Sequence, residues 1–415
     1  MEGLPNRNFR NISNSEFSDL GVKLSNIVTV ETIDDLRKTN PNIVIAECVK
    51  SVQFKQNNYQ YSQELKKNVK YIMALGIYHQ LYFDTRINQR ILKPSGLKFN
   101  KMYKPYIGQD LTDKTLLIWR TGGIGDLLFI QPNLKYLKEK YPTCKIFFAC
   151  GPQYQSMVKN WKYIDQVIDL PFSLYYMIHS DYHAIFEGVI ERTKQAEKEN
   201  AYRLFTKWLG LNLPDELLIP EQTPNGESVF ECQAVLEEWK VKEKDFILIQ
   251  IRSSSPIRNP NPDVFKKLIN ELTKKGYNVI LTDINQREET LGIYIKTLNN
   301  PDKVFNFAPH SKEIADTIAL TSLAKLCIAT DSALNHIAIS LGIKTFGIFG
   351  AFTGNIRLET YPENMRDWVD CQSDCSPCFI HSLNHCKNAL SGYSKCYNSL
   401  DINLCVEKIE RLLNV

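Results

Sequence analysis

Three glycines and an aspartate form a compact turn in the first third of the chain. The glycines are Gly122, Gly123 and Gly125. The turn lies between a buried-type apolar run at Thr115–Trp119 and an amphipathic pattern that continues to Lys140, which predicts a strand, a tight turn and a helix. Backbone N–H groups at a helix start favour an anion, and glycine lets a ligand approach the backbone. Asp126 is either a chemical group or a residue that only stabilises the helix N-terminus.

A dinucleotide site does not fit this turn. The spacing is Gly-Gly-x-Gly-Asp and not Gly-x-Gly-x-x-Gly. The next predicted strand ends in Cys150-Gly151, without an acid to hold a ribose. We therefore treat the turn as a candidate phosphate or acceptor loop.

A second strand-to-helix turn carries polar residues. It contains Asp331, Ser332, Ala333 and, one helical turn later, His336. Asp331 and Ser332 can cap this helix, whose first N–H groups make a natural seat for a diphosphate. The next strand ends in a small-residue turn at the same sheet edge, with Gly350 and Thr353. A lone histidine at such a position is more often a capping or core residue than a ligand.

Six of the eleven cysteines lie between Cys371 and Cys405. Four of them have the spacing C-x2-C-x7-C-x9-C, namely Cys375, Cys378, Cys386 and Cys396. Four thiolates at this spacing predict a tetrahedral structural site for zinc or iron, with no open position. The alternative ligands are Cys371, His381 and His385. Cys405 is expected to be a core residue of the last helix, and a set of free buried thiols is the alternative to a metal.

Two sets of alternating strands and helices are predicted around these motifs. The first has strands at 115–119, 145–149, 166–170 and 182–187. A linker at 214–228 leads to the second, which has strands at 246–251, 278–281, 304–306, 326–329 and 345–349 and helices at 263–275, 311–321 and 333–341. Such alternation predicts parallel sheets with helices on both faces. We expect two Rossmann-like domains facing a cleft, at residues 111–225 and 226–360, and a Cys-rich finger with a closing helix at 361–415.

Residues 1–110 carry no chemical motif and form a predicted accessory domain. Apolar runs at 27–30 and 43–46 are candidate strands, and residues 61–83 have helical spacing. A stretch without acidic residues contains Arg86, Arg90, Lys93, Lys98, Lys101 and Lys104. This basic strip is either a polyanion-binding surface or a solvated linker.

The composition is that of a globular protein, with 43% hydrophobic and 23% charged residues and a formal net charge of +4. The longest apolar runs have the length of a strand, and the N-terminus lacks the hydrophobic core of a signal peptide. We therefore expect a cytoplasmic protein without a membrane span.

The two turns together resemble those of the heptosyltransferase-type glycosyltransferases, family 9, over residues 114–410. The N-terminal match runs from Leu116 to Asp126 and continues through Pro132 and Tyr141-Pro142. The C-terminal match comprises Asp331-Ser332-Ala333, His336, Leu341-Gly342 and Phe349-Gly350. The resemblance implies a GT-B fold, with an acceptor-binding N-terminal domain, a nucleotide-binding C-terminal domain and a transfer that inverts the anomeric centre without a catalytic metal.

The resemblance also implies roles for single residues. Asp126 matches the general base, and Arg258, favoured by position over Arg252, matches the cation that stabilises the leaving diphosphate. Ala333 stands where the family commonly has Gly, and Gly350-Ala351-Phe352-Thr353 stands where it has Gly-Pro-Thr, so the donor sugar stays open. Relatives that modify bacterial autotransporters resemble this chain in carrying a cysteine-rich metal finger.

The sequence thus predicts an inverting glycosyltransferase that moves heptose or a related sugar from a nucleotide donor, with an ADP-sugar favoured, to a hydroxyl of a glycan, lipid or protein acceptor. A transferase that modifies nucleic acid, as some bacteriophage enzymes do, is an alternative supported only by the basic strip. A non-catalytic sugar-nucleotide-binding protein is another, although Asp126 and His336 argue against it. The oligomeric state stays open.

Overall fold

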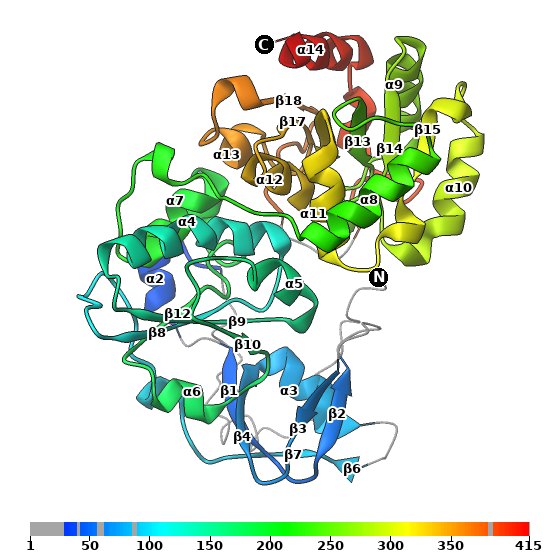
Figure 1. The fold of residues 1–415 in the computed structure, drawn as a ribbon. Coiled ribbons are helices and arrows are strands. Elements are labelled where there is room, and N and C mark those ends of the chain that lie inside the picture. Colours follow the sequence, from blue (N-terminus) through cyan, green and yellow to red (C-terminus); the bar gives the residue numbers. More distant parts are fainter. Residues whose placement is uncertain (1–28, 40–41, 56–61, 85–88, 381–384, 415) are drawn as a thin grey trace.

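The computed structural model describes residues 29–39, 42–55, 62–84, 89–380 and 385–414 (Figure 1). Its main sheets are a six-stranded parallel sheet, a four-stranded parallel sheet and a four-stranded antiparallel sheet. In Figure 1 these lie at the top, in the middle and at the bottom, respectively. The prediction of an α/β fold with parallel sheets is therefore confirmed.

The four-stranded parallel sheet has the order β10-β9-β8-β12. Its strands lie close to the predicted ones, with bounds β8 Thr115–Trp119, β9 Lys145–Cys150, β10 Gln166–Asp169 and β12 Tyr182–Ile185. One face packs on helices in a single buried cluster. These helices are α2 Ile33–Arg37, α4 Ile124–Lys140, α5 Gln155–Val158 and α7 Ala201–Trp208. The apolar runs of the sequence form these strands because both of their faces are buried.

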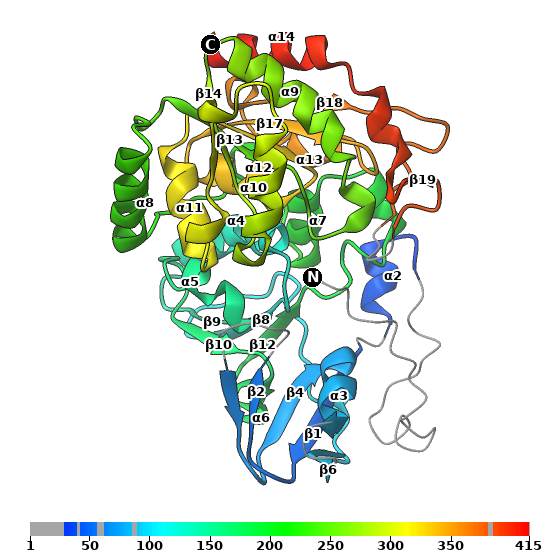
Figure 2. The ribbon, with the colours of Figure 1, turned by 90° about the vertical axis from the view of Figure 1, so that its right-hand side faces the viewer.

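The other face of this sheet is covered by the antiparallel sheet and not by helices, which corrects the prediction of helices on both faces (Figure 2). The covering sheet has the order β11-β4-β1-β7, with bounds β1 Ile43–Cys48, β4 Lys70–Ala74, β7 Leu92–Pro94 and β11 Phe172–Ser173. Ile45 and Ile72 pack against Leu117 and Trp119 in one buried cluster. Helix α6, Leu174–Ile178, adds Leu174 to the same cluster. The apolar face that residues 43–74 offer thus takes the place of a helical layer.

The prediction of a helix at residues 61–83 is wrong over most of that segment. The segment contains β3 Ser62–Leu65, β4 Lys70–Ala74 and helix α3 Leu75–Tyr82. Asn68 has a φ of 63° and makes the turn between the two strands. The same apolar residues satisfy a helical and a strand pattern, so pairing of β4 with β1 and burial of Ile72 decide the outcome.

The remaining short strands belong to hairpins of this region. Strand β2 Val52–Lys55 pairs with β3, and β5 Phe83–Asp84 pairs with β6 Gln89–Arg90. The predicted strand at 43–46 is confirmed within β1. Of the candidate strand at 27–30, residues 27 and 28 lie outside the described residues, and Val30 forms a single bridge with Thr193.

The six-stranded sheet has the order β15-β14-β13-β16-β17-β18 and is parallel throughout. Five strands match the predicted ones, with bounds β13 Phe246–Gln250, β14 Asn278–Leu281, β15 Val304–Asn306, β16 Leu326–Thr330 and β17 Lys344–Phe349. The sixth strand, β18 Arg366–Asp370, was not predicted because charged residues at both ends leave too short an apolar run to indicate a strand.

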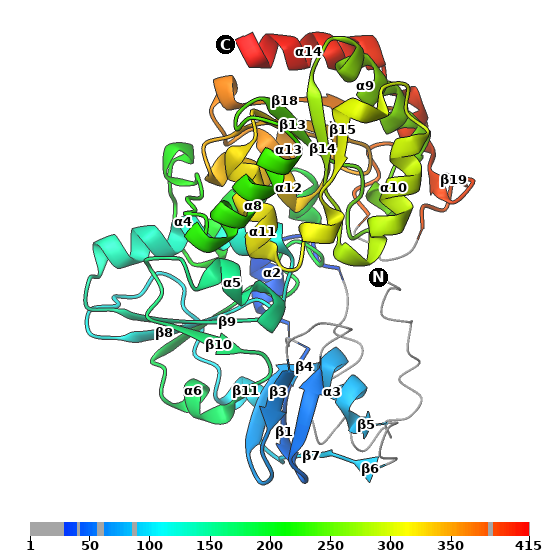
Figure 3. The ribbon, with the colours of Figure 1, turned by 45° about the vertical axis from the view of Figure 1, so that its right-hand side comes forward.

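Helices cover both faces of this sheet, as predicted. Their bounds are α8 Gly226–Glu238, α9 Pro262–Lys274, α10 Glu288–Lys296, α11 Ile314–Leu323, α12 Ala333–Ser340, α13 Asn355–Leu358 and α14 Ile402–Asn414. Helix α8 takes the last residues of the linker expected at 214–228. The hairpin of β19 Ala389–Leu390 and β20 Tyr393–Ser394 projects from the edge of this domain (Figure 3).

The two parallel-sheet domains share a buried core where α4 and α7 meet α12. Phe129 of α4 and Tyr202 of α7 belong to the same buried cluster as Ile337 of α12, Leu358 and Tyr361. Burial of apolar side chains between domains makes their relative placement part of the folded core.

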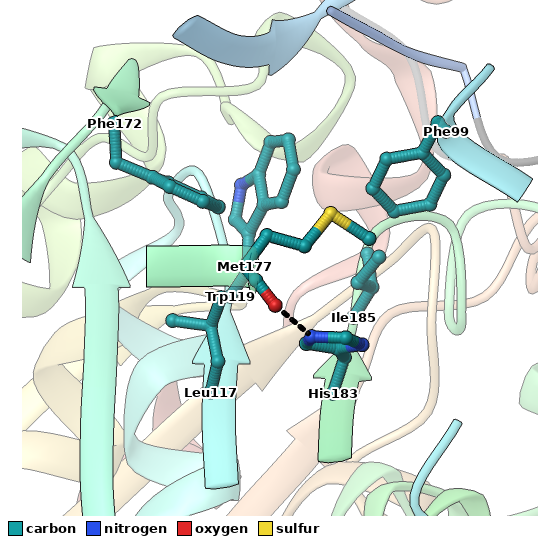
Figure 4. A pocket seen from close by; sticks show the side chains of 7 residues that line it. All are labelled: Phe99, Leu117, Trp119, Phe172, Met177, His183 and Ile185. Carbon is teal, nitrogen blue, oxygen red and sulfur yellow. Dashed lines mark hydrogen bonds between the residues drawn. The ribbon is translucent and has the colours of Figure 1, made fainter. Parts of the chain in front are cut away.

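A small apolar cavity lies between the antiparallel sheet and the four-stranded parallel sheet (Figure 4). It is lined by Phe99, Leu117, Trp119, Phe172, Met177, His183 and Ile185. His183 is buried and both ring nitrogens have partners, because Nδ1 accepts from the Lys104 backbone N–H at 2.9 Å and Nε2 lies 3.0 Å from the Met177 carbonyl. We interpret this cavity as a packing feature between the two sheets.

Within the described part of the chain, no helix combines the length and the apolar character that a membrane crossing requires.

Candidate functional site

Asp126 lies in the first turn of α4, at the end of the four-stranded sheet. The helix starts after Gly123, whose φ of 88° is a conformation that glycine adopts readily. A Cβ added at Gly123 would run into the Asp126 carboxylate, and one added at Gly122 would lie 2.8 Å from the Tyr154 ring. The glycines therefore allow the turn to fold closely over Asp126.

The carboxylate of Asp126 is held by a buried arginine. Nη2 of Arg120 donates to Asp126 Oδ2 at 2.5 Å and also to Glu191. Nε and Nη1 donate to the carbonyls of Gly122 and Phe186, each at 3.0 Å. Glu187 Oε2 lies 3.7 Å from Nη1 of the same guanidinium.

Three carboxylates thus share one counter-ion, which sets the electrostatics of the turn. Burial raises the pKa of the Asp126 carboxyl, the charge of Glu191 acts in the same direction, and Arg120 opposes both. The Asp126 side chain keeps 22% of its surface exposed, whereas Arg120 keeps 5%. A partly exposed carboxylate with a raised pKa is a stronger base than a free carboxylate.

Asp331 is buried at the end of β16 and pairs with two arginines. Its Oδ2 lies 3.4 Å from Nη1 of Arg258, and its Oδ1 lies 3.3 Å from Nε of Arg357. The Arg258 side chain is 23% exposed, and the Arg357 side chain is 5% exposed with its Cζ 4.2 Å from the centre of the Phe352 ring. This cluster carries an excess of positive charge, which suits an anion.

Ser332 is the N-cap residue of α12, but its side chain does not cap the helix. Its hydroxyl donates instead to Gln250 Oε1 at 2.8 Å, which corrects the prediction of a capping serine. The half-buried Ala333 follows it as the first helical residue. The predicted diphosphate seat at this helix start lies next to Asp331 and its two arginines.

His336 lies in the core shared by the two domains. It is 4% exposed, and its Nδ1 lies 2.6 Å from Tyr361 Oη. Burial lowers the pKa of its imidazole to about 3, so the ring is neutral. A Cβ added at Gly125 would lie 3.4 Å from His336 Cδ2, so the two predicted motifs meet at this point.

The other predicted donor residues occupy the loops around this cluster. Gly350 packs against the cysteine segment, because a Cβ there would lie 2.7 Å from Cys396 Sγ. Thr353 is half-buried in the loop before α13. Arg252 is half-buried after β13, where its charge counteracts the rise that burial causes in the pKa of Asp283. The structure therefore joins Arg258, and not Arg252, to Asp331.

Of the four predicted metal-binding cysteines, Cys378 and Cys386 pack against one small apolar cluster. Burial raises the pKa of the Cys396 thiol to about 11, with smaller contributions from Cys386, Cys378 and Cys375. Over residues 29–39, 42–55, 62–84, 89–380 and 385–414, no three His, Cys, Asp or Glu side chains are grouped closely enough to hold a metal ion. The metal site therefore stays a prediction.

The other cysteines of this segment and the alternative histidine ligands of the predicted metal site lie in different environments. Cys405 is a fully buried core residue of α14, as predicted, and Cys371 is buried in the same cluster. Nδ1 of His385 lies 3.0 Å from the Gly392 carbonyl. His381 lies outside the described residues.

The basic strip is only partly described. Arg86 lies outside the described residues, and Lys93 forms an ion pair with Glu47 at 2.9 Å. Lys101 and Lys104 are exposed, whereas Lys98 is half-buried.

Sequence reasoning missed Arg120, Arg357 and Tyr361, which contact predicted site residues. It also missed Glu187 and Glu191, which pair with Arg120. The available signals were weak: Glu187 and Glu191 follow a strand at the edge that carries the turn, and Arg357 is a single charge between apolar neighbours. Their convergence depends on contacts between elements that are distant in sequence.

Residues 193–387 match the model of glycosyltransferase family 9 (heptosyltransferase). Among curated proteins, no sequence matches this chain. Similar solved structures include a family 9 glycosyl transferase from Veillonella parvula, at 14% identity and a TM-score of 0.57, which covers 74% of this chain and 98% of the other.

Two structures from E. coli are also similar. ADP-heptose lps heptosyltransferase II has 13% identity and a TM-score of 0.55, and covers 72% of this chain and 98% of the other. The iron-containing dodecameric glycosyltransferase TibC, from enterotoxigenic E. coli, has 14% identity and a TM-score of 0.51, and covers 93% of this chain and 98% of the other. These likenesses show a shared fold. The family match, together with this fold, identifies the chain as a glycosyltransferase.

Proposed function

We propose that this enzyme is an inverting glycosyltransferase of the heptosyltransferase type. It would transfer heptose or a related sugar from a nucleoside diphosphate, with ADP favoured, to an acceptor hydroxyl. The observation that carries the proposal is the approach of two oppositely charged sites, one around Asp126 and one around Asp331, at the joint between the domains. In support, Gly125 beside Asp126 lies against His336 of the helix that follows Asp331, and the charge of Arg357 lowers the pKa of Asp126.

In this proposal Asp126 is the general base. Its raised pKa and partial exposure let it take the proton of the acceptor hydroxyl while that oxygen attacks the anomeric carbon. Arg120 holds the carboxylate in place through a hydrogen bond of 2.5 Å. Gly122, Gly123 and Gly125 let the Tyr154 ring, the Asp126 carboxylate and His336 pack closely against the turn.

The leaving diphosphate would be stabilised by Arg258, Arg357 and the N-terminal N–H groups of α12. Asp331 orients the two arginines, since it pairs with both. Fixed positive charge at the leaving group stabilises the transition state without a catalytic metal, as the family resemblance implies. Arg252, Ser332, Ala333, Gly350 and Thr353 are proposed to line the donor site around this cluster.

We further propose that the chain has the GT-B layout. Residues 111–225 would bind the acceptor and residues 226–360 the nucleotide sugar, with residues 1–110 as an accessory region and residues 361–415 as a Cys-rich finger with its closing helix. In support, the antiparallel sheet from the accessory region packs on the domain that carries the proposed base. Its position suits recognition of a glycan, lipid or protein acceptor.

Cys375, Cys378, Cys386 and Cys396 are proposed to hold one structural zinc or iron ion per chain. Four thiolates are the soft ligands that such metals prefer, and the similar structure of TibC is described as iron-containing. Elemental analysis of protein purified without chelator tests this, and a metal content near zero per chain would overturn it. TibC is also described as dodecameric. Size-exclusion chromatography with light scattering on the same protein would therefore measure the oligomeric state.

The donor is tested by thermal unfolding with a panel of ADP-, GDP-, UDP- and dTDP-sugars. A ligand that binds only the folded state raises the melting temperature with its concentration relative to Kd. We expect the ADP-sugar to stabilise most. Stabilisation by none of the sugars would contradict the transferase proposal, and binding without turnover on any acceptor would favour the non-catalytic alternative.

A further inference from the structure

A chain of three buried polar side chains crosses from one domain to the other. His336 Nδ1 lies 2.6 Å from Tyr361 Oη, which lies 2.7 Å from Tyr202 Oη. His336 is on α12 and Tyr361 follows α13 in the six-stranded domain, whereas Tyr202 is on α7 of the other domain. The three residues are 4%, 2% and 0% exposed. Water therefore does not compete for these hydrogen bonds, and breaking one leaves a buried polar group without its partner.

The same chain contacts the helix that carries Asp126. The Phe129 ring packs edge-on against His336 and against Tyr202, with ring centres 4.7 Å apart in both pairs. Phe129 lies one helical turn after Gly125, where an added Cβ would be 3.4 Å from His336 Cδ2. The first turn of α4 thus rests on the imidazole.

The protonation state of His336 is compatible with a static hydrogen-bonded chain. Because the ring is neutral, one nitrogen carries a proton and the other accepts. With the proton on Nε2, Tyr361 donates to Nδ1 and accepts from Tyr202, so both hydroxyl groups are used. This assignment of the tautomer follows from the hydrogen-bond network.

We infer that His336, Tyr361 and Tyr202 are positioning residues that lock α12 against α4 and α7. They hold the turn of Asp126 in register with the arginines of the other domain, and His336 does not bind the donor. The expected site role of His336 is thereby replaced by a structural one. The consequence for turnover rests on the proposed function, whereas the coupling between the domains does not.

Conservative variants test the coupling between the two domains in an experiment that does not depend on enzymatic activity. Tyr202→Phe breaks only the bond between the domains, and Tyr361→Phe breaks both bonds. The matched control is Tyr294→Phe, which loses a hydrogen bond of 3.0 Å to the Pro262 carbonyl inside one domain. The measurement is amide hydrogen exchange of the full chain by mass spectrometry.

We expect Tyr202→Phe to speed exchange in α12 by about tenfold, although the substitution lies in the other domain. Tyr361→Phe should do the same in α12 and in the first turn of α4, and Tyr294→Phe should change neither helix. Exchange in α12 that stays as in the unmodified protein for both Tyr202→Phe and Tyr361→Phe would overturn the inference.

Binding of ADP separates a positioning role from a donor contact. By calorimetry, Tyr202→Phe, Tyr361→Phe and His336→Ala should keep the Kd for ADP within about threefold, while ADP release from ADP-heptose slows at least tenfold. If His336→Ala alone weakens ADP binding tenfold or more, His336 is a donor ligand and the inference is wrong. If the unmodified protein binds no ADP, the proposed function fails, while hydrogen exchange still decides the coupling.

Discussion

The turn at Arg120–Asp126 and the turn at Thr330–His336 each follow a strand of a parallel sheet and open a helix, but they have opposite charge balances. In the first, Asp126, Glu187 and Glu191 surround one arginine. In the second, Asp331 lies between two arginines. In the proposed function, the same local geometry would serve a proton acceptor on one side of the joint and an anion on the other, since the side chains around each helix start set its electrostatics.

The largest expected effect comes from removing the proposed base, Asp126. Asp126→Asn keeps the size of the side chain and should lower turnover by about 10²–10⁴-fold, with unchanged donor affinity. Turnover is measured as ADP release, and affinity by thermal shift with the donor. The matched control is Asp302→Asn, an exposed residue of the other domain, which should retain full turnover. Turnover by Asp126→Asn within tenfold of the unmodified enzyme would assign the base elsewhere.

Removing Arg120, the counter-ion shared by Asp126, Glu187 and Glu191, tests the electrostatics of the first turn. Arg120→Met should lower the free energy of unfolding by about 2–4 kcal/mol, because three carboxylates lose their partner while keeping some contact with water. Urea unfolding measures this effect. Arg203→Met, which loses pairs to Asp215 and Glu359 at a half-exposed position, should cost about 1 kcal/mol or less.

Arg120→Met should also change the pH dependence of turnover. A base must be deprotonated to act, so turnover falls as pH drops through the pKa of Asp126. Arg120 lowers that pKa, and its loss should move the acid limb of the pH–rate profile to higher pH. A limb that stays in place or moves to lower pH would show that another group controls it.

Neutralising the arginine-rich side should weaken donor binding. Arg258→Met and Arg357→Met should each raise the Kd for ADP by about 10–100-fold, the value of a charge-assisted hydrogen bond. Arg252→Met should raise the Kd less than either, because the charge of Arg252 acts on Asp283 and not in the pair with Asp331. The matched control is Arg411→Met, an exposed arginine that pairs with Asp367, which should change the Kd by less than about threefold. The reverse order of effects would reassign the phosphate contact to Arg252.

The smallest effect concerns stability in acid. Burial lowers the pKa of His183 to about 4 and of His336 to about 3, against an ordinary value of 6.5. The unfolded state then binds more protons than the folded state, so these residues lower stability as pH falls from 6.5 towards 4, by about 1 kcal/mol per histidine and pH unit. Urea unfolding between pH 7 and 5 should show a smaller pH slope for His183→Gln, and an unchanged slope would contradict a buried neutral His183.

Much of the fold was predictable because its strands carry strong local signals. The strands at 115–119, 278–281 and 304–306 have the predicted bounds, since continuous apolar runs form strands that are buried on both faces. The helix expected at 61–83 failed because Leu65, Ile72 and Leu75 fit both periodicities, and only pairing with β1 distinguishes them. Strand β18 lacked an apolar run altogether.

The sequence by itself determined the two strand-to-helix turns, their glycines and the acids that follow them, because these depend on neighbouring residues and on backbone conformation. Only the tertiary structure decided that Arg120 gathers Glu187 and Glu191 around Asp126, and that Arg357 joins Arg258 on Asp331. It also showed that His336, predicted at the donor site, is buried in the core between the domains and bonded to Tyr361. These side chains are distant along the chain, and burial in a common core selects their partners.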